Sequence, residues 1–383
     1  MHTETKHSST AHPLSQSPSI GIIGIGKLGL CFALNLERTG YRVMGTDINE
    51  TYVELVNDKK LISYEPQVEE YLKASKHFTA STQLSDILHS DCEFIFIVVA
   101  TPSLPNGKYN HQQVEAVLSE LMAFGKAEKQ RHLVLMCTTM PGYSDTMAER
   151  LAPYNYTVSY NPEFIAQGSI MRDQQEPDQV LIGEPNPEVG QKLEDIYRNM
   201  CLNEPTFCRM SRLSAEICKI ATNCFLTTKI SFANSIGDLA TKVGAEPDKI
   251  LSAIGADKRI GGRYLKYGFG FGGPCFPRDN RALGVFAEES GYELLISKAT
   301  DEVNSRHLDF QVQQWLCAYP KEEQIVFDHI TYKKGSTMIE ESQQLALAVK
   351  LAQAGRKVKV QGPQVVMEEV KGIYGDLLEY EIV

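Results

Sequence analysis

The sequence predicts an α/β protein with three parts: an N-terminal doubly wound parallel sheet, a central helical domain and a small C-terminal α/β domain. Three observations predict it. Short apolar runs alternate with helical patterns up to about residue 205. A proline-free helical pattern then runs from Ser211 to about Val243, and strand and helix patterns alternate again after residue 320. Such alternation is typical of parallel sheets that are covered by helices.

The first domain is expected over residues 19–205. A βαβ unit opens it, with an apolar strand and glycine-rich turn in "SIGIIGIGKLG", a helix in "LGLCFALNLERTG" and a second strand in "YRVMGTDI". Further strand-like runs are "CEFIFIVVA", "HLVLMCTT", "TVSYNPEF" and "DQVLIG". Residues 1–18 are polar throughout, so we expect a disordered tail and no signal peptide.

The remaining chain divides into two further expected domains. Residues 206–320 contain a long spine helix from about 211 to 243, and its length favours a helical domain over another sheet unit. Residues 321–383 contain "EQIVFDHI", "SQQLALAVKLAQAG", "RKVKVQG", "VVMEEVKGIYGDLL" and "YEIV". This order predicts a β-α-β-α-β domain.

Composition excludes several classes of function. The chain has 383 residues and a formal net charge of −10, which opposes binding to nucleic acid or to an anionic membrane. Its nine cysteines are odd in number and include no CxxC pair, so neither a disulfide framework nor a zinc site is indicated. No apolar stretch approaches the ~18 residues of a membrane span. We expect a cytoplasmic protein with reduced thiols and no bound metal, in which the eight cysteines other than Cys275 fill the core.

The glycine-rich turn predicts a dinucleotide site. Three glycines form GxGxxG between a strand and a helix: they permit a tight turn, let backbone approach a pyrophosphate, and let helix and strand pack closely. An aspartate follows the second strand, where it can accept from ribose hydroxyls but would repel a 2′-phosphate. NAD is therefore favoured over NADP, and the alternative is a turn with no function. The expected cofactor-binding residues here are Gly24, Gly26, Lys27, Leu28, Gly29 and Asp47.

Two threonines end later strands. Thr101 lies in "VVATPS" and Thr139 in "CTTMPG". Ligands of open α/β sheets bind beyond the carboxyl ends of the strands, so both are candidate cofactor neighbours. The alternative for each is an ordinary turn residue.

The segment "KYGFGFGGPCFPRD" (residues 266–279) surrounds Cys275 with glycines, aromatics and prolines. Glycines leave the backbone uncovered, so such a loop can wrap a ligand and offer N–H groups to phosphate. A thiol acts as a nucleophile when it is ionised and reachable. The alternative is a flexible surface loop, which would gain nothing by exposing three phenylalanines.

Two further features are candidates for chemistry. Lys219 and Asn223 are four residues apart on the spine helix, so they share one face and together suit an oxyanion. A solvated surface lysine is the alternative. Glu163 follows a strand in "NPEFIAQG", where an ordinary strand-to-loop corner is the alternative.

Taken together, these segments resemble the nucleotide-sugar dehydrogenases, the family of UDP-glucose and GDP-mannose dehydrogenases, and within it the UDP-glucose 6-dehydrogenase branch. The likeness runs from the glycine turn through "VVATPS", "NPEF", "AEICKIATNCFLTTKISF", "DKRIGGRYLKYGFGFGGPCFPRD" and "YKKGS". It covers nearly the whole chain after residue 18. The cysteine loop and the spine-helix segment are its most specific parts.

The resemblance implies a four-electron oxidation of a sugar C6 alcohol to a carboxylate, most closely UDP-glucose to UDP-glucuronate, with reduction of two NAD+. Cys275 would form a thiohemiacetal and then a thioester, which water would hydrolyse. Lys219 and Asn223 would stabilise oxyanions, and Asp279 or Glu163 would activate the water. Thr139 would lie in the same catalytic site.

The resemblance also implies a substrate site. Arg259 would reach the sugar from a neighbouring subunit, Tyr264, Leu265 and Lys266 would lie along the diphosphate, and Tyr332 and Lys333 would close over the nucleotide. The full expected set is Phe164, Ile165, Lys219, Asn223, Arg259, Tyr264, Leu265, Lys266, Gly272, Tyr332 and Lys333.

The chain departs from the family pattern at several positions. Gln167 replaces a usual glutamate and cannot act as a base, which shifts water activation to Asp279 and Glu163. Glu340 replaces an arginine that contacts a partner subunit's cofactor, and Arg278 stands where lysine is usual. The last domain looks abbreviated.

Other functions remain open at this point. They are a dehydrogenase of another nucleotide sugar such as GDP-mannose, a nucleotide-sugar-binding paralogue with little turnover, and a two-electron hydroxyacid dehydrogenase, which would not need Cys275. Apolar positions on several faces of the spine helix, together with Arg259, favour a homodimer through the central helix.

Overall fold

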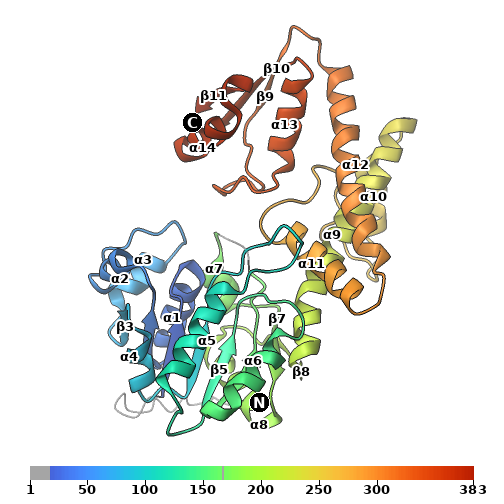
Figure 1. Ribbon diagram of the computed structural model, residues 1–383. Coiled ribbons are helices and arrows are strands. Elements are labelled where there is room, and N and C mark those ends of the chain that lie inside the picture. Colours follow the sequence, from blue (N-terminus) through green and yellow to red (C-terminus); the bar gives the residue numbers. More distant parts are fainter. Residues whose placement is uncertain (1–17, 166–167) are drawn as a thin grey trace, which may run out of the picture. The chain divides into compact units, whose positions relative to one another are not determined.

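The computed structural model describes residues 18–165 and 168–383, which form two compact units (Figure 1). Among the described residues, the first unit comprises 18–102, 109–165 and 168–216. The second comprises 103–108 together with 217–383. The expected disordered tail, apart from Pro18, and Gln167 both lie outside the described residues.

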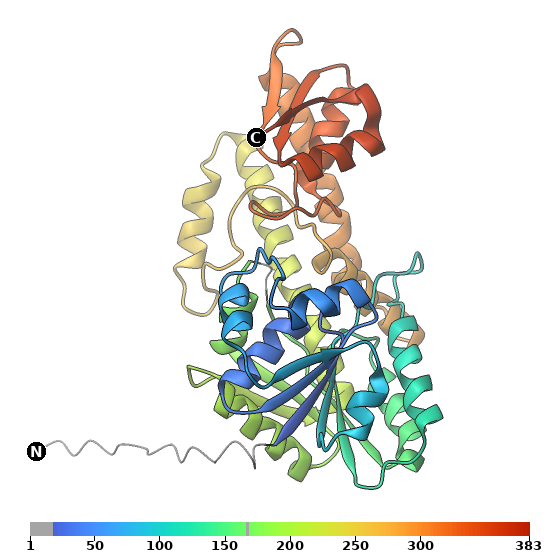
Figure 2. The same cartoon turned by 90° about the vertical axis from the view of Figure 1, so that its left-hand side faces the viewer.

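An eight-stranded sheet forms the centre of the first unit, with helices on both of its faces (Figures 1 and 2). In spatial order its strands are β3 Phe78–Ser81, β2 Arg42–Thr46, β1 Ser19–Ile23, β4 Phe94–Ile97, β5 Arg131–Leu135, β6 Tyr156–Tyr160, β7 Gln179–Glu184 and β8 Thr206–Ser211. Its helical segments are α1 Lys27–Arg38, α2 Glu50–Asn57, α3 Val68–Ala74, α4 Leu84–His89, α5 Gln112–Phe124, α6 Tyr143–Leu151, η2 Ala152–Tyr154, α7 Ile170–Gln175 and α8 Pro187–Met200. The predicted alternation of strands and helices is confirmed.

The expectation of a wholly parallel sheet is wrong at one pair. β7 pairs antiparallel with β6, while the other neighbouring strands are parallel. The connection between them carries the short helix α7, which is tied to α1 through Asn35: its Nδ2 donates to Gln174 (3.0 Å) and its Oδ1 accepts from Gln175 (2.8 Å). Because α7 stays beside α1, the chain enters β7 from the end of the sheet at which β6 finishes.

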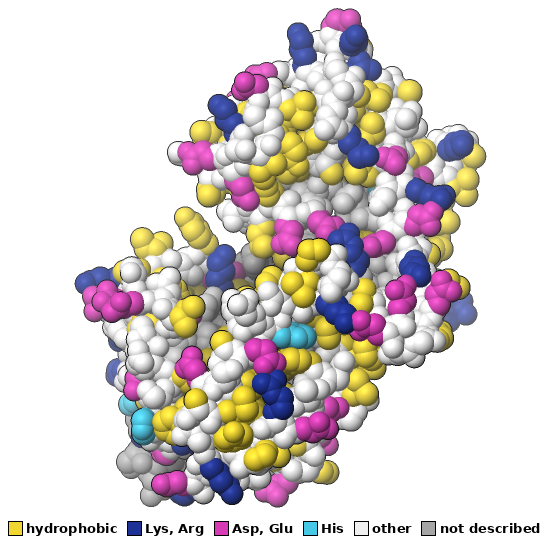
Figure 3. All heavy atoms as spheres, in the orientation of Figure 1, with side chains coloured by type: hydrophobic (Ala, Val, Ile, Leu, Met, Phe, Trp, Pro, Cys, Tyr) yellow, Lys and Arg dark blue, Asp and Glu magenta, His cyan; other side chains and the backbone are white. Residues whose placement is uncertain are grey.

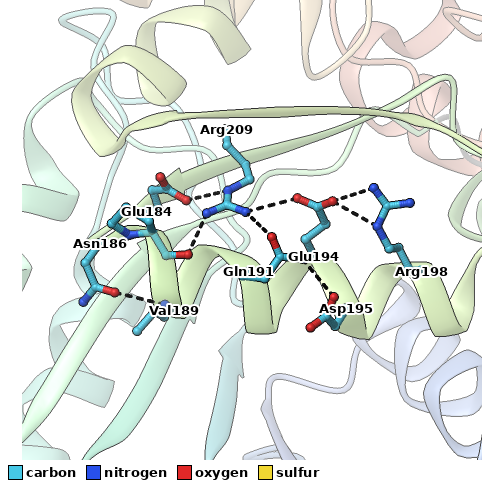
Figure 4. A network of polar contacts seen from close by, with 9 residues as sticks. Glu184, Asn186, Val189, Gln191, Glu194, Asp195, Arg198 and Arg209 are labelled. Carbon is cyan, nitrogen blue, oxygen red and sulfur yellow. Dashed lines mark hydrogen bonds and ion pairs between the residues drawn. The ribbon is translucent and has the colours of Figure 1, made fainter.

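The sheet also continues past residue 205, where we expected the first domain to end, because β8 pairs with β7 over six residues. A polar network joins β8 to β7 and α8 (Figure 4). In it, Arg209 of β8 donates to Glu184 (2.7 Å), to Gln191 (2.7 Å) and to the Pro187 carbonyl (2.6 Å). These bonds hold β8 as an edge strand of the sheet.

The core of the first unit lies between α1 and the central strands. Ile20, Ile22, Phe32 and Phe96 are buried there, and the rings of Phe32 and Phe96 meet edge to face with centroids 4.9 Å apart. Burial of this kind stabilises the fold by roughly 1.5–3 kcal/mol per large apolar side chain. The carboxyl ends of β1, β4 and β5 are thereby fixed beside one another.

The second unit consists of long helices and a small sheet. Helix α9 spans Arg212–Val243, as predicted, and is followed by α10 Pro247–Gly255, α11 Phe276–Glu289 and α12 Leu295–Ala318. The predicted β-α-β-α-β order is confirmed after it, with β9 Gln324–Phe327, α13 Gln343–Gln353, β10 Lys357–Gly362, α14 Gln364–Tyr374, η3 Gly375–Leu377 and β11 Glu379–Ile382. The three strands are parallel, in the order β11-β10-β9. The ring of Trp315 on α12 stacks on that of Phe327 on β9, with centroids 5.1 Å apart. The small sheet therefore shares a core with the helices.

Charged side chains of both signs are interspersed on the face that Figure 3 shows. Among residues 18–165 and 168–383, no helix combines the length and the hydropathy that a bilayer crossing requires.

Candidate active site

The glycine turn has the geometry that a pyrophosphate site needs. Gly24 has φ +89°, and a Cβ there would lie 2.5 Å from the Val98 carbonyl oxygen. A Cβ on Gly29 would lie 2.0 Å from the Gly24 carbonyl oxygen, so helix and turn approach too closely for any other residue. Gly26, at the start of α1, is exposed and has open space where a Cβ would be. The first and third glycines are thus required by packing, and the second leaves the backbone open to a ligand.

The residues beside the turn fit the same cofactor. Asp47 directly follows β2, the neighbour of β1, and its Oδ1 accepts from the Asn49 N–H (3.1 Å). Lys27 is exposed at the first position of α1, whereas Leu28 packs against the core. A carboxylate next to the turn suits the two ribose hydroxyls of NAD.

Thr101 and Thr139 both belong to the same edge of the sheet, but both are buried and hydrogen-bonded within the protein. Thr101 donates to the Thr138 carbonyl (2.7 Å), and Thr139 donates to Glu216 (3.1 Å). Glu216 also accepts from the N–H groups of Gly142 (2.6 Å) and Ser144 (2.9 Å) at the start of α6. Burial raises the pKa of Glu216, and these hydrogen bonds offset part of that rise. The threonines therefore shape the loops after β4 and β5.

Glu163 lies in the loop after β6, with Phe164 and Ile165 beside it, and all three are half-buried. Its charge acts on Tyr197, whose pKa lies well above the usual range because of burial first and Glu163 second. The Tyr197 hydroxyl donates to Asn161 (2.5 Å). Glu163 thus stands next to a buried polar pair of the first unit.

Cys275 is exposed and occupies the N-cap position of α11, with Pro277 at the second helical position. The positive end of the helix dipole favours an anion there, and here that anion would be the thiolate. Its carbonyl accepts from the N–H of Asp279 (2.8 Å) one turn on.

Lys219, Asn223 and Asp279 are all buried. Asn223 donates from Nδ2 to Asp279 Oδ2 (2.6 Å). Arg278 donates from Nε to the other carboxylate oxygen (3.2 Å). Lys219 is 7% exposed, so it is not a solvated surface lysine. The polar groups of α9 and α11 form one cluster around the base of the cysteine loop.

The pKa of the Cys275 thiol lies above its usual range. Desolvation by the surrounding protein is the largest cause, although the residue as a whole remains exposed. Arg278 and Lys219 lower this pKa, whereas Asp279 and Glu340 raise it. The thiol is therefore reachable, and the charges beside it oppose one another.

The segment that follows β9 packs against the cysteine loop through backbone. The N–H of Gly273 donates to the Glu340 carbonyl (3.0 Å). Gly273 has φ +82°, and a Cβ there would lie 2.4 Å from the Tyr332 ring. A Cβ on Gly272 would lie 2.2 Å from the Glu341 carbonyl oxygen. Tyr332 thus packs on the cysteine loop, and the exposed Lys333 follows it.

The other expected substrate residues lie on the loop between α10 and α11. Tyr264 has φ +62°, and its ring meets Phe276, next to Cys275, with centroids 6.1 Å apart. Leu265 is buried, and it lines an open hollow of about 520 Å³ beside α10 together with Lys266. Arg259 is exposed and ion-paired with Asp257 of its own loop (2.6 Å).

The expectation that the other eight cysteines fill the core is wrong in part. Cys31, Cys92 and Cys224 are buried, four others are half-buried, and Cys317 is exposed on α12. Cys317 lies in the last turn of that helix, where the outer face meets solvent. None of the nine cysteines, all of which lie in the described residues, forms a disulfide bond. The described residues also contain no cluster of three or more His, Cys, Asp or Glu arranged for a metal ion.

Comparison with known proteins places this geometry in a family. Residues 18–201 match the model of the "UDP-glucose/GDP-mannose dehydrogenase family, NAD binding domain", and residues 213–306 match the central domain of the same family. The UDP-glucose 6-dehydrogenase of Pseudomonas aeruginosa is 31% identical over 359 residues, which cover 89% of this chain and 78% of that protein. The chain belongs to the UDP-glucose/GDP-mannose dehydrogenase family. It is an NAD-dependent nucleotide-sugar dehydrogenase.

Solved structures agree with this family membership. A UDP-glucose dehydrogenase from Pyrobaculum islandicum superposes with a TM-score of 0.85 at 30% identity, over 98% of this chain and 88% of that one. A GDP-mannose dehydrogenase from Pseudomonas aeruginosa gives a TM-score of 0.58 at 26% identity, over 92% of this chain and 82% of that one. Members of the family thus differ in their sugar nucleotide.

In this family member, sequence reasoning missed several residues that shape the site. Glu216 orders the loop after β5. The one feature of the sequence that could have indicated this role is that Glu216 is a lone carboxylate in an apolar part of the spine helix. Asn234 and Asn304 hold the backbone of the cysteine loop. They could not be found from sequence, because an asparagine on a helix gives no sign of the distant loop that it contacts.

Proposed function

We propose that the chain oxidises the C6 alcohol of UDP-glucose to the carboxylate of UDP-glucuronate, with Cys275 as the covalent nucleophile. The observation that carries the proposal is an exposed thiol at the N-terminus of α11, beside the buried group of Lys219, Asn223 and Asp279. A dehydrogenase that stopped at two electrons would have no use for such a thiol.

The residues divide the reaction between them. The reaction would use two NAD+ molecules, each of which accepts one hydride when bound. After the first hydride transfer, the Cys275 thiolate adds to the C6 aldehyde, which gives the tetrahedral carbon from which a second hydride can leave. The resulting thioester is hydrolysed: water adds its oxygen to the acyl carbon, and the thiolate departs. The substrate thus loses four electrons and gains one oxygen atom.

Lys219 and Asn223 would stabilise the oxyanions of these steps. Lys219 is buried, and a cation shielded from water acts strongly on a developing negative charge. Asn223 gives one amide hydrogen to Asp279 and has a second to offer. Lys219 would also share the proton of the alcohol in the first step.

Asp279 would orient and activate the hydrolytic water, with Glu163 as the second candidate base. Asp279 is 1% exposed, and its two carboxylate oxygens already accept from Asn223 and Arg278. Arg278 would hold this carboxylate in place for that role.

UDP-glucose is proposed as the substrate because the relatives cited above at 30–31% identity act on it by name. Phe164, Ile165, Gly272 and Arg259 would contact the sugar, and the run 264–266 would lie along the diphosphate. Tyr332 and Lys333 would close over the nucleotide.

A second candidate is a nucleotide-sugar-binding protein with low turnover. It is favoured by Glu340, whose charge raises the pKa of the Cys275 thiol where the family usually has an arginine. A second nucleotide sugar, GDP-mannose, remains an alternative substrate.

A substrate panel separates these candidates. Purified protein with NAD+ should reduce two NAD+ per UDP-glucose, and far fewer with GDP-mannose or with N-acetylated sugar nucleotides. One NAD+ per sugar would exclude the covalent four-electron route. Binding of UDP-glucose without reduction of NAD+ would favour the second candidate.

We further propose a homodimer through α9. Phe225, Phe232 and Leu239 are exposed at intervals of seven residues, so they lie along one face of the helix. An apolar stripe of this kind is typical of an interface, and a second copy presents the same stripe. Sedimentation velocity should give a dimer for the native chain and a monomer for Phe232→Glu. A monomeric native chain would contradict the proposal.

A further inference from the structure

Side chains from two helices hold the backbone of the glycine-rich loop that leads to Cys275. From α9, Asn234 accepts from the Gly268 N–H (3.1 Å) and donates to the Phe269 carbonyl (3.3 Å). From α12, Asn304 accepts from the N–H of Phe271 (2.9 Å) and donates to its carbonyl (2.9 Å). The loop is therefore fixed from outside, despite its glycines.

A third support comes from a buried histidine. His307 of α12 is 1% exposed, and its Nε2 lies 2.6 Å from the Gly268 carbonyl oxygen. Its Nδ1 lies 2.9 Å from each carboxylate oxygen of Asp238 on α9. The Tyr267 hydroxyl donates to the same carboxylate (2.8 Å), and its ring meets the imidazole edge-on.

This arrangement requires one shared proton. A carbonyl oxygen can only accept, so Nε2 must donate to it. Nδ1 can then bond Asp238 in two ways. In one, the imidazolium donates from Nδ1 to the carboxylate; in the other, neutral Nδ1 accepts from the protonated carboxyl group. Both forms hold the same number of protons. If that proton leaves, a lone pair faces an acceptor, or Asp238 keeps a charge with no cation against it.

Two further side chains contact this clamp. The Tyr267 hydroxyl donates to Asp238, and Gln311 gives a neutral N–H to the Gly268 carbonyl (3.1 Å). Because Gln311 and Asn234 remain when the His307 side chain is removed, the loop would loosen rather than detach.

We propose that Asp238 and His307 are positioning residues of the active site: their shared proton fixes the Gly268 carbonyl and thereby the path of the loop that presents Cys275. The inference rests on the proposed function only for the role of Cys275, since the clamp itself involves no substrate.

Hydrogen exchange followed by mass spectrometry tests the clamp directly. The peptide covering residues 266–275 is compared at a single pH in the native chain and in three variants. His307→Ala removes the clamp. The double variant Asp238→Asn with His307→Gln replaces it by two amides that can pair and still donate to Gly268. His329→Gln alters an exposed Asp–His pair of the same unit and serves as the matched control.

We expect protection of this peptide to be native in His329→Gln and close to native in the double variant. His307→Ala should exchange roughly tenfold faster or more, because a charge-assisted hydrogen bond is lost. The rate at which iodoacetamide alkylates Cys275, followed on its own peptide, should change in His307→Ala and return to the native rate in the double variant.

Native protection of this peptide in His307→Ala would overturn the proposal, and so would a double variant that exchanges as fast as His307→Ala. If His307→Ala does not fold, the single variant Asp238→Asn takes its place and should exchange faster than the double variant. Neither readout requires sugar oxidation, so a failure of the proposed function would leave this result interpretable, and the reverse also holds.

Discussion

The two glycine-rich segments of the molecule are built on different principles. In the turn of residues 24–29, the glycines are needed because backbone atoms meet backbone atoms: a Cβ on Gly29 would lie 2.0 Å from the Gly24 oxygen. In the loop of residues 266–275, the backbone is held by Asn234, Asn304 and His307, which come from helices far away in the sequence.

The difference shows which residues determine the geometry of each segment. The turn depends on residues within a few positions of one another, so its spacing alone predicts a pyrophosphate site. The loop depends on side chains that lie up to 40 residues away, so its order becomes visible only in the folded chain. Breaking each segment should therefore have a different signature.

The largest effect is expected in the turn. Gly29→Ala should lower the free energy of unfolding by about 3 kcal/mol, because the methyl group overlaps the Gly24 carbonyl. Gly26→Ala is the matched control: the space there is open, so stability should change by less than about 1 kcal/mol while NAD+ binds more weakly. Urea unfolding and NAD+ titration measure both. Equal stability of the two variants would contradict this account of the turn.

The next effect concerns the polar cluster at the base of the loop. Asp279→Asn should reduce kcat on the order of a hundredfold, because the carboxylate that orients water and pairs with Arg278 is neutralised. Asp309→Asn, which removes an exposed carboxylate of α12, is the control and should retain native turnover. Steady-state kinetics distinguish them, and native kcat in Asp279→Asn would remove Asp279 from the mechanism.

A smaller effect is expected within the loop itself. Gly273→Ala should destabilise the protein by about 2 kcal/mol, since its φ is +82° and the methyl group would meet the Tyr332 ring. Gly268→Ala has open space at its Cβ and should be close to native in stability. Thermal unfolding measures the pair. If both variants were native-like, Tyr332 would not be packed on the loop.

The smallest effect is on the thiol. The charge of Glu340 raises the pKa of Cys275, so Glu340→Gln should move the alkylation profile of this cysteine to lower pH. Lys219 lowers the same pKa, so Lys219→Gln should move the profile to higher pH. Iodoacetamide labelling across a pH series, read on the Cys275 peptide, gives both directions. Shifts of the same sign would show that neither charge acts on the thiol directly.

Much of the fold followed from the sequence because strand and helix periods are local. The alternation of elements, the helix from 212 to 243 and the last β-α-β-α-β run were all predicted. The reversed strand β7 and the extra strand β8 were not, because they depend on where α7 docks and on Arg209 reaching Glu184 across the sheet. Spacing placed Lys219 and Asn223 on one helix face, and the family resemblance suggested their roles, whereas Glu216 and His307 act on segments that no spacing reveals.

The central claim is that Cys275 carries the sugar as a covalent thioester. Quantifying uronic acid by mass spectrometry in the native chain, in Cys275→Ser and in Cys317→Ser tests it most directly, because Cys317 is the other exposed thiol. We expect Cys317→Ser to form acid at the native rate, and Cys275→Ser to lose acid formation on the order of a thousandfold or more. Acid formation at the native rate in Cys275→Ser would contradict the account.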